Sequence, residues 1–253
     1  MNTGIILQAR TGSTRLPGKI LKPFYKEDTI LDIIIKQFKD NSFGFPVTLA
    51  TSINEKDACL EDYARKHEVL FFRGSENNVL QRFIDAAEAN GFSNIVRVCA
   101  DNPFLNMEGF ETLAKAFANV PDLDYLSFKN HKDKPAIKTH WGLFTEFVSL
   151  NALKKVDSLT QDPLYLEHVT NYIYEHPEDN FKIKLLEAPD PVYRREDIRF
   201  TIDTLEDFEL LKKQYSDYLK SYSIFALENL VDFVDGRPEV LKSMKINIKT
   251  NSK

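Results

Sequence analysis

The sequence has few of the features that mark secreted, zinc-binding or membrane proteins. Only two cysteines occur among its 253 residues, Cys59 and Cys99, and neither has metal-ligand spacing. A disulfide framework is therefore excluded, and we expect both to be small core residues in a reducing compartment. No apolar run approaches the ~20 residues of a membrane-spanning helix. An apolar run starts almost directly after Met1, so we expect no targeting peptide, no membrane insertion and a cytoplasmic protein.

An excess of positive charge is also lacking. The chain carries 33 Lys and Arg against 38 Asp and Glu, which gives a formal net charge of −5. Nucleic-acid-binding proteins usually carry a basic face, so we expect no nucleic acid partner. Against this acidic background, Arg10, Arg15 and Lys19 place three cations within ten residues. Such a local concentration of positive charge is expected of a site for a small anionic ligand.

The first half of the chain alternates apolar runs of strand length with amphipathic segments of helix length. The predicted strands are residues 4–9, 46–51, 69–73 and 95–100, and the predicted helices are residues 30–39, 56–66, 78–90 and 108–118. This βαβα order predicts an α/β fold, a mainly parallel sheet with helices on both faces. Ligands of such sheets bind beyond the carboxyl ends of the strands. The loop after the first strand, the turn at Arg73-Gly74 and the turn after Ala100 all lie at that edge.

The second half is less regular. We predict strands at 123–128, 143–147, 181–186 and 199–203, and helices at 163–175, 205–215 and 225–234. The polar stretch 129–140 is expected to be a loop that covers the substrate. No repeat or low-complexity linker divides the chain, so we expect a single domain over residues 1–244 with a small lobe or acceptor region within about 123–190. Residues 245–253 are expected to be a polar, frayed tail.

The loop after the first predicted strand has the composition of a polyphosphate site. Backbone N–H groups at Gly12 and Ser13 can approach phosphate oxygens closely because glycine has no side chain. The cations Arg10, Arg15 and Lys19 then neutralise phosphate charge. The alternative is a surface turn with incidental charges.

The spacing of this loop differs from two common phosphate-binding motifs. Five residues separate Gly12 from Gly18, and Ile20 follows Lys19, whereas the P-loop has four residues between its glycines and a hydroxyl residue after its lysine. The dinucleotide fingerprint G-x-G-x-x-G is absent as well.

Two aspartates are candidate metal ligands. Asp101 leaves its predicted strand at the same edge as the loop, where it either holds Mg²⁺ against a nucleotide phosphate or caps a helix. Thr204 and Asp207 fit a capping box. Asp203 is then left either to support that helix N-terminus, which the residues alone favour, or to act as a second metal ligand.

The segment 72–82 reads as a strand, a turn and a helix. Arg73 and Arg82 are placed to reach a nucleotide and Gly74 permits close approach to a base or ribose, although Ser75 alone explains the turn as a helix cap. The five histidines show no metal-ligand spacing. His168 lies in a polar cluster within a helical pattern, and a lone histidine of this kind is more often structural than catalytic.

Several blocks of the chain resemble one family. The segment Gln8-Ala9-Arg10-Thr11-Gly12-Ser13-Thr14-Arg15-Leu16-Pro17-Gly18-Lys19 closely resembles the N-terminal signature of the cytidylyltransferases that activate acidic sugars, a group that includes the CMP-Kdo and CMP-acylneuraminate synthetases. The resemblance is closest to the spore coat polysaccharide biosynthesis protein F branch and covers roughly residues 3 to 215. Later blocks agree in order: Ala50-Thr51-Ser52, Phe72-Arg73-Gly74-Ser75, Val79-Leu80, Arg97-Val98, Ala100-Asp101-Asn102-Pro103, Glu167-His168-Val169-Thr170 and Thr201-Ile202-Asp203-Thr204 with Glu206-Asp207.

This resemblance implies a Rossmann-like nucleotidyltransferase fold of the glycosyltransferase A type, with a small lobe that often mediates dimerisation and hence a homodimer. It implies that the catalytic residues are Arg10, Lys19, Asp101 and Asp203, and that the two aspartates bind Mg²⁺. The implied nucleotide-binding residues are Ala9, Arg10, Gly12, Ser13, Arg15, Lys19, Arg73, Gly74, Asn78 and Arg82. One departure is Asn77-Asn78, where the branch usually carries acidic residues, so a carboxylate contact to base or ribose is lost there.

The implied reaction is the transfer of CMP from CTP to a sugar hydroxyl with release of pyrophosphate, in surface polysaccharide or glycan biosynthesis. Polar candidates for the acceptor pocket are Lys129, Lys138, His140, Glu146 and His168. One alternative is a nucleotidyltransferase with another base or acceptor, such as a sugar 1-phosphate or an alcohol phosphate. A nucleotide-sugar-dependent glycosyltransferase usually carries Asp-x-Asp, which Asp101-Asn102-Pro103 lacks. A non-catalytic nucleotide-binding protein is the third alternative.

Overall fold

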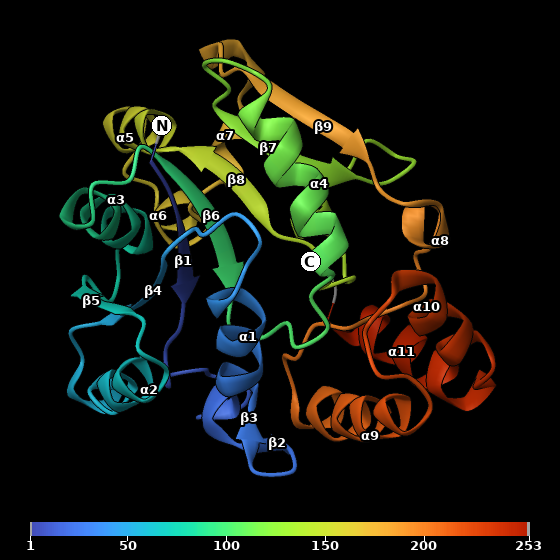
Figure 1. Cartoon of the computed structure of the whole chain (residues 1–253). Coiled ribbons are helices and arrows are strands. Elements are labelled where there is room, and N and C mark those ends of the chain that lie inside the picture. The colour runs from blue at the N-terminus through green and yellow to red at the C-terminus, as the bar shows by residue number, and fades with distance from the viewer. Residues whose placement is uncertain (1, 252–253) are drawn as a thin grey trace.

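A seven-stranded sheet in the order β5-β4-β1-β6-β8-β7-β9 forms the middle of the protein in the computed structural model, which describes residues 2–251 (Figure 1). Its strands are β1 (Thr3–Gln8), β4 (Val47–Ser52), β5 (Leu70–Gly74), β6 (Asn94–Cys99), β7 (Tyr125–Lys129), β8 (Glu146–Ser149) and β9 (Ile183–Glu187). Only β8 runs antiparallel to its neighbours. A short hairpin of β2 (Pro23–Tyr25) and β3 (Asp28–Thr29) stands apart. The predicted mainly parallel α/β sheet is confirmed.

Helices cover both faces of the sheet. One face packs against α1 (Ile30–Lys39), α2 (Leu60–His67) and α4 (Met107–Ala118), and the other against α3 (Val79–Ala89), α5 (Leu150–Leu159) and α7 (Asn171–Glu175). Side chains alternate across a strand, so β1 sends Ile5 and Leu7 into the first layer and Ile6 into the second. Two apolar cores therefore fix the register of the strands that carry the site.

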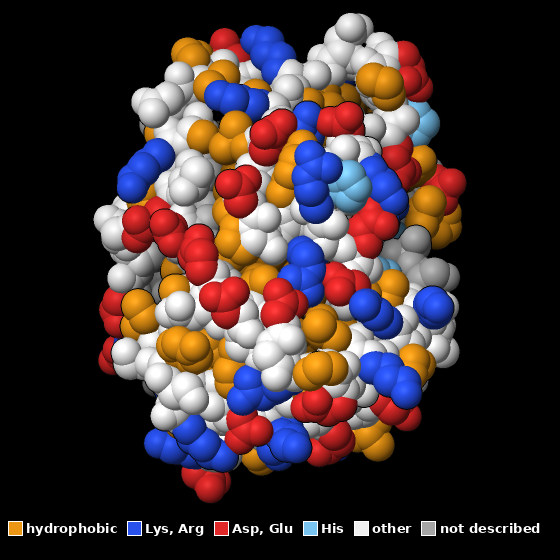
Figure 2. Space-filling view, turned by 90° about the vertical axis from the view of Figure 1, so that its right-hand side faces the viewer, with side chains coloured by type: hydrophobic (Ala, Val, Ile, Leu, Met, Phe, Trp, Pro, Cys, Tyr) orange, Lys and Arg blue, Asp and Glu red, His pale blue; other side chains and the backbone are white. Residues whose placement is uncertain are grey.

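Three C-terminal helices lie together beside the first layer, at the lower right of Figure 1: α9 (Leu205–Ser221), α10 (Leu227–Asp235) and α11 (Pro238–Thr250). Aromatic rings join α9 to α10, with Tyr218 and Phe233 in edge-to-face contact at a centroid distance of 5.3 Å. The short helices α6 (Pro163–Glu167) and α8 (Asp190–Tyr193) and four 3₁₀ turns, Lys19–Leu21, Glu55–Asp57, Ala136–Lys138 and Pro177–Asp179, complete the described chain. Of the helices within residues 2–251, none is both long and apolar enough to cross a membrane. On the face in Figure 2, basic and acidic side chains are interspersed.

The predictions for the first half agree with the structure to within a few residues, except that the predicted helix 56–66 begins as a 3₁₀ turn and becomes regular at Leu60. The predicted helix 163–175 is wrong as one unit, because the chain breaks at residues 168–170 into α6 and α7. Residues 199–203 are extended but form no strand. Their backbone N–H groups bond to loops instead, Phe200 to the His140 carbonyl and Ile202 to the Asp101 carbonyl.

The frayed tail is also wrong for residues 245–250, while residues 252–253 lie outside the described part of the chain. Residues 245–250 continue α11, whose Val240 and Met244 lie one helical turn apart and are buried in the core. Neither the helix α5, nor the end of β8 at Ser149, nor the β2–β3 hairpin was predicted from the sequence.

Asp32 in α1 is a buried carboxylate that ties α1 to α2. It caps the helix with Thr29 and accepts hydrogen bonds from Lys66 at 2.8 Å and His67 at 2.6 Å. Burial opposes ionisation of Asp32, but these bonds outweigh it and hold the pKa of the carboxyl well below its ordinary value. The stabilisation is therefore fully present above pH ~4, the ordinary carboxyl pKa, and is lost as the pH falls below it.

We predict that Asp32→Asn lowers the free energy of unfolding at pH 7 by about 3 kcal/mol. The difference from the wild type narrows between about pH 5 and pH 2, because the Asp32 carboxyl of the unfolded wild type takes up a proton there and the stabilisation is lost. Urea unfolding at a series of pH values measures both effects. The exposed Asp62→Asn is the control and changes stability by less than about 0.5 kcal/mol. A gap that is constant with pH would contradict the prediction.

Candidate active site

The loop after β1 folds back on itself at the carboxyl edge of the sheet. The N–H groups of Gly18 and Ser13 donate to the Thr11 carbonyl at 2.9 and 3.0 Å. Gly18 has a φ of 67°, the left-handed conformation that glycine adopts without strain. A Cβ atom built on Gly12 would meet nothing within 4 Å. The loop is thus compact, yet its Gly12 backbone faces open space that a ligand can fill.

Asp57 anchors this loop from the 3₁₀ turn after β4. Its Oδ1 accepts from the Thr11 N–H at 2.7 Å and from the Thr11 hydroxyl at 2.6 Å, and the Ser52 hydroxyl donates to its other oxygen. Burial opposes ionisation of Asp57, but these hydrogen bonds outweigh it and lower the pKa of the carboxyl. Nothing in the sequence pattern marked Asp57, because its partner lies 46 positions away.

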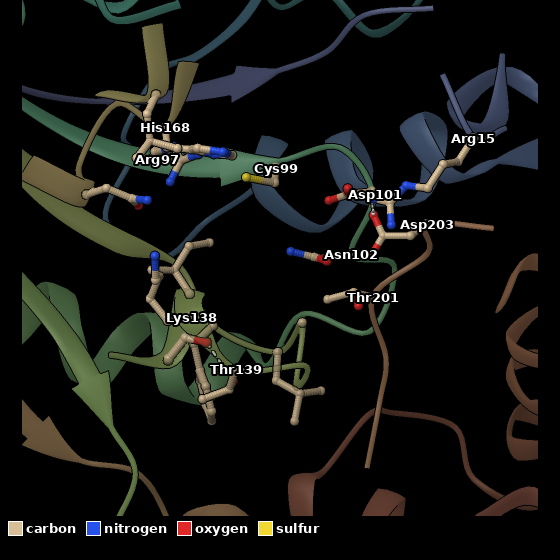
Figure 3. A pocket seen from close by; sticks show the side chains of 17 residues that line it. Arg15, Arg97, Cys99, Asp101, Asn102, Lys138, Thr139, His168, Thr201 and Asp203 are labelled. Carbon is tan, nitrogen blue, oxygen red and sulfur yellow. Dashed lines mark hydrogen bonds and ion pairs between the residues drawn. The ribbon is translucent and has the colours of Figure 1, made fainter. Parts of the chain in front are cut away.

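Asp101 and Asp203 are brought together as predicted. The Ile202 N–H donates to the Asp101 carbonyl at 3.2 Å, which joins the segment after β6 to the segment before α9. Lys19 Nζ lies 3.0 Å from Asp101 Oδ2 and also donates to the Ile202 carbonyl. Arg15 lies 2.8 Å from Asp203 Oδ1. The cations of the loop and the two carboxylates form one network, part of which is visible in Figure 3.

The buried Arg199 side chain holds Asp203 through an ion pair. Its guanidinium, 1% exposed, lies 2.7 Å from Asp203 Oδ2 and 2.8 Å from Asp207 Oδ2. The predicted capping box of Thr204 and Asp207 is present at the start of α9. Burial opposes ionisation of Asp207, but Arg199 outweighs it and lowers the pKa of that carboxyl. The Asp203 carboxylate is therefore linked to the start of α9 through Arg199 and Asp207, while its other oxygen faces Arg15.

Two cavities meet at these carboxylates. The loop cavity has a volume of about 310 Å³ and is lined by Gln8, Arg10, Ser13, Thr14, Arg15, Lys19, Ile20, Cys99, Ala100, Asp101, Glu167, His168 and Asp203. The β6 cavity has a volume of about 440 Å³ and is lined by Arg15, Arg97, Cys99, Asp101, Asn102, Ala136, Ile137, Lys138, Thr139, Gly142, Leu143, Phe144, Leu164, His168, Asn171, Thr201 and Asp203. The two share Arg15, Cys99, Asp101, His168 and Asp203. Both aspartates thus stand where the cavities join.

The β6 cavity has chemically different ends. Figure 3 shows Asp101 and Asp203 at one end, Arg97 and His168 at the other, and Asn102 between them. Arg97 and Cys99 line this cavity because β6 side chains two residues apart lie on the same face of the sheet. Asp101, in the turn after β6, lines it as well.

Arg97 is held by the strand that runs antiparallel to β6. The register sets Arg97 opposite Glu146 on β8, and their side chains pair at 2.6 Å. Tyr125 and Thr170 donate to the same carboxylate. Lys138, nearby in Figure 3, pairs with Glu175 at 3.0 Å. Of the predicted acceptor candidates, Lys138 and His168 line this cavity and Glu146 lies behind it.

The break between α6 and α7 explains the position of His168. Arg10 pairs with Glu167 at 3.0 Å, which holds the end of α6 over the loop. The next residue, His168, ends the helix and lines both cavities. His168 alone favoured a structural role, although it was also a candidate for the acceptor pocket, and the break in the helix brings it into the wall of both cavities.

The predicted base and ribose residues lie outside both cavities. Arg73 donates to the carbonyls of Ser52 and Asn54 at 3.1 and 2.9 Å, and Asn78 caps α3 by accepting from the Gln81 N–H at 2.8 Å. Arg73 thus has structural partners at the end of β4, and Asn78 has one within α3.

Arg82 is fully buried in the same unit and donates to the Ser75 carbonyl at 2.9 Å. Burial, together with the charge of Arg10, lowers the pKa of Arg82 to about 10. A Cβ on Gly74 would lie only 3.0 Å from Arg82 Cγ, so glycine allows this close packing. Ala9 is buried as well, with its N–H bonded to the Ala50 carbonyl at 3.1 Å. The nucleotide contacts of these residues stay predictions.

The chain matches known proteins over nearly its whole length. A family model described as cytidylyltransferase matches residues 4–235. The spore coat polysaccharide biosynthesis protein SpsF of Bacillus subtilis is 34% identical over 240 residues, which cover 92% of this chain and 94% of that protein. A solved cytidylyltransferase structure from Leptospira borgpetersenii has 30% identity and a TM-score of 0.81, and the match covers 95% of this chain and 97% of that one.

A CMP:2-keto-3-deoxy-manno-octonic acid synthetase complexed with CTP shares the fold, with a TM-score of 0.65 at 14% identity over 86% of this chain and 99% of that one. The Rossmann-like nucleotidyltransferase fold expected from the opening signature is therefore confirmed. With the loop, the paired aspartates and the fold in agreement, this chain is an enzyme, a nucleotidyltransferase that belongs to the cytidylyltransferase family.

Proposed function

We propose that this enzyme is a Mg²⁺-dependent cytidylyltransferase that transfers CMP from CTP to a hydroxyl group of an acidic sugar, for a surface polysaccharide or glycan. The observation that carries the proposal is the pairing of Lys19 and Arg15 with Asp101 and Asp203 at the junction of two cavities. Nucleotidyl transfer needs a triphosphate and an acceptor on opposite sides of one phosphorus atom. Two cavities that share their carboxylates supply that arrangement.

The loop cavity suits the triphosphate. Arg10, Arg15 and Lys19 line it together with Ser13, and the open backbone at Gly12 offers its N–H group to a phosphate oxygen. The choice of CTP is supported by the family and by the synthetase of the same fold, which is complexed with CTP. The polysaccharide context is supported by the name of the Bacillus relative.

The donor set at the junction fits Mg²⁺. Carboxylate oxygens are its preferred protein ligands, and it is commonly held by one or two carboxylates together with substrate phosphates. Asp101 and Asp203 supply two carboxylates within one network. When bound, the ion would stabilise charge on the α-phosphate and lower the pKa of the acceptor hydroxyl. Lys19 and Arg15 balance the negative charge of the two carboxylates in the structure. Both belong to the loop, so their side chains can turn to the oxygen atoms of a bound phosphate.

In the proposed reaction the acceptor oxygen forms a bond to the α-phosphorus, the bond to the pyrophosphate oxygen breaks, and the hydroxyl proton leaves to solvent. Negative charge develops on the leaving pyrophosphate, where Lys19 and Arg15 stabilise it. His168 lines the junction but lies at the Arg97 end of the β6 cavity in Figure 3. That place suits contact with the acceptor better than removal of its reacting proton.

The β6 cavity suits a sugar with a negative charge. Its volume of about 440 Å³ lies in the range of small-molecule sites. Arg97 lies within β6 and Asp101 in the turn that follows it, so the two stand at opposite ends of this cavity (Figure 3). Arg97 and Lys138 put two cations at the end remote from the aspartates. Each is already paired with a carboxylate, Arg97 with Glu146 and Lys138 with Glu175, so what they offer an acidic acceptor is their remaining N–H donors.

The direct test measures pyrophosphate release with Mg²⁺, each of the four NTPs and a panel of α-keto acid sugars and sugar phosphates. We expect release with CTP and an α-keto acid sugar. Release only with a sugar 1-phosphate or only with another NTP would replace the proposed acceptor or base. CTP binding without turnover on any compound would favour a non-catalytic protein.

We predict that Asp101→Ala keeps the fold and lowers pyrophosphate release by more than about 1000-fold, because a charge-stabilising group of the transition state is lost. Steady-state kinetics and thermal unfolding of the purified variant measure the two properties. Asp232→Ala, an exposed aspartate on α10, is the matched control and keeps full activity. Retained turnover in Asp101→Ala would refute the assigned role.

We also predict that Asp57→Ala raises the KM for CTP by about 10-fold to 100-fold, the equivalent of losing hydrogen bonds to a buried charge. Thr11 then loses its anchor, and the loop that faces the triphosphate is less well ordered. The KM for the acceptor changes little, since Asp57 lines neither cavity. Asp57→Asn, which keeps one acceptor oxygen, recovers part of the loss. An unchanged KM for CTP in a folded Asp57→Ala enzyme would show that the anchor is dispensable.

A further inference from the structure

Asn102 and Thr201 are buried polar side chains of the β6 cavity with unmet hydrogen-bonding capacity. They are 5% and 4% exposed, and within the described chain Asn102 Oδ1 and Thr201 Oγ1 have no hydrogen-bond partner. A buried polar atom without a partner costs about 1–3 kcal/mol. Apolar residues of the same shape would avoid this cost, so the unmet capacity points to a ligand.

Both side chains belong to the two segments that carry the aspartates. Asn102 directly follows Asp101, and Thr201 precedes Asp203 by two residues in an extended stretch. The hydrogen bond between the Ile202 N–H and the Asp101 carbonyl, 3.2 Å long, holds the segments together. Each segment thus contributes one carboxylate to the junction and one neutral polar side chain to the adjoining cavity.

Gly142 lets these two side chains converge. It has a φ of 62°, and a Cβ built on it would lie 3.0 Å from Asn102 Oδ1 and 2.8 Å from Thr201 Cγ2. The two side chains therefore approach the same point of the cavity wall. In Figure 3 the Asn102 carboxamide extends into the space between the two ends of the cavity, with its nitrogen foremost.

We propose that Asn102 and Thr201 determine acceptor specificity by hydrogen-bonding two oxygen atoms that flank the reacting hydroxyl. The Asn102 carboxamide hydrogen-bonds one of them, with Oδ1 accepting from a hydroxyl group or Nδ2 donating to an oxygen atom, and the Thr201 hydroxyl pairs with the other. The acceptor is accordingly a polyhydroxylated compound with oxygen substituents next to the attacking oxygen, not a simple alcohol. The inference rests on the proposed function and adds the residues that select its acceptor.

The magnitude of such selection is large when the site itself is buried. A cavity built to hydrogen-bond a substrate oxygen rejects the analogue that lacks it, because the polar groups of the site are then left without partners. If instead Asn102 and Thr201 were only tolerated defects, replacing them with apolar residues of the same shape would leave substrate binding unchanged and would be neutral or stabilising for the fold. The two cases are therefore separable by kinetics.

The test uses Asn102→Leu and Thr201→Val, which keep the shape and remove the hydrogen bonds. Pyrophosphate release is measured with Mg²⁺, CTP and a probe panel of α-keto acid sugars, aldonic acids and hexose 1-phosphates. We expect each variant to raise the acceptor KM by about 10-fold and to leave the CTP KM within about twofold. Deoxy analogues of the acceptor, already weak for the wild type, lose nothing further in the matching variant.

Two further arms identify the bound oxygens and control for folding. An acceptor whose carboxylate is converted to an amide, tested beside the deoxy analogues, shows whether Asn102 holds a carboxylate or a hydroxyl oxygen. Thr201→Ser keeps the hydroxyl and restores the wild-type acceptor KM. Thr48→Val is the matched control, because Thr48 on β4 is equally buried and its hydroxyl also has no partner within residues 2–251, but it does not line the β6 cavity. It leaves both KM values unchanged.

An unchanged acceptor KM in both folded variants would overturn the inference, as would an equal rise in the CTP KM. Calorimetry with Mg²⁺ and CTP separates this failure from that of the proposed function. If the wild type turns over an acceptor of the panel and neither variant changes its KM, only the inference fails. If the wild type binds CTP and turns over no compound of the panel, the proposed function fails as well. If it does not bind CTP at all, the proposed function itself fails.

Discussion

The contact on which the site depends is the pairing of Lys19 with Asp101 and the neighbouring Ile202 carbonyl. It joins the loop after β1, the turn after β6 and the segment before α9, which are far apart in the sequence. Two carboxylates at one point repel each other unless cations stand beside them. Lys19 and Arg15 supply this balance within the protein itself. A triphosphate that entered with the proposed metal would add anionic and cationic charge together and so keep the balance.

The sheet makes this contact possible because strand register fixes where each loop begins. β1 and β6 are parallel neighbours, and their register pairs Gln8 with Cys99, the last residue of each strand. The loop after β1 and the Asp101 turn therefore start side by side. The reversal of direction at β8 has a second effect, because it places Glu146 across from Arg97 and so fixes a buried guanidinium in the wall of the β6 cavity.

Buried charges around the site act as supports. Asp57 holds Thr11, Arg199 holds Asp203 and Glu146 holds Arg97, and each of these supports is at least nine-tenths buried and hydrogen-bonded. Burying a charge is costly unless it is paired and hydrogen-bonded. The hydrogen bonds offset the cost, and they restrict each supported group to one orientation. The reacting groups are therefore positioned before any ligand binds, which is where much of the rate enhancement of phosphoryl and nucleotidyl transfer arises.

Features whose cause is local could be predicted from the amino-acid sequence. Alternating periodicity indicated the first four strands and helices, the composition of residues 8–19 indicated the phosphate loop, and the end of an apolar run placed Asp101 at the functional edge. Asp57, Arg199 and the pairing of Arg97 with Glu146 emerged only in the folded chain, because their partners are brought together by strand register and by packing of helices. The break at His168 and the helix over residues 245–250 depended on tertiary packing in the same way. Local patterns cannot report contacts between segments that only folding brings within hydrogen-bond distance. The β6 cavity, with Asn102 and Thr201 in its wall, is formed by such contacts.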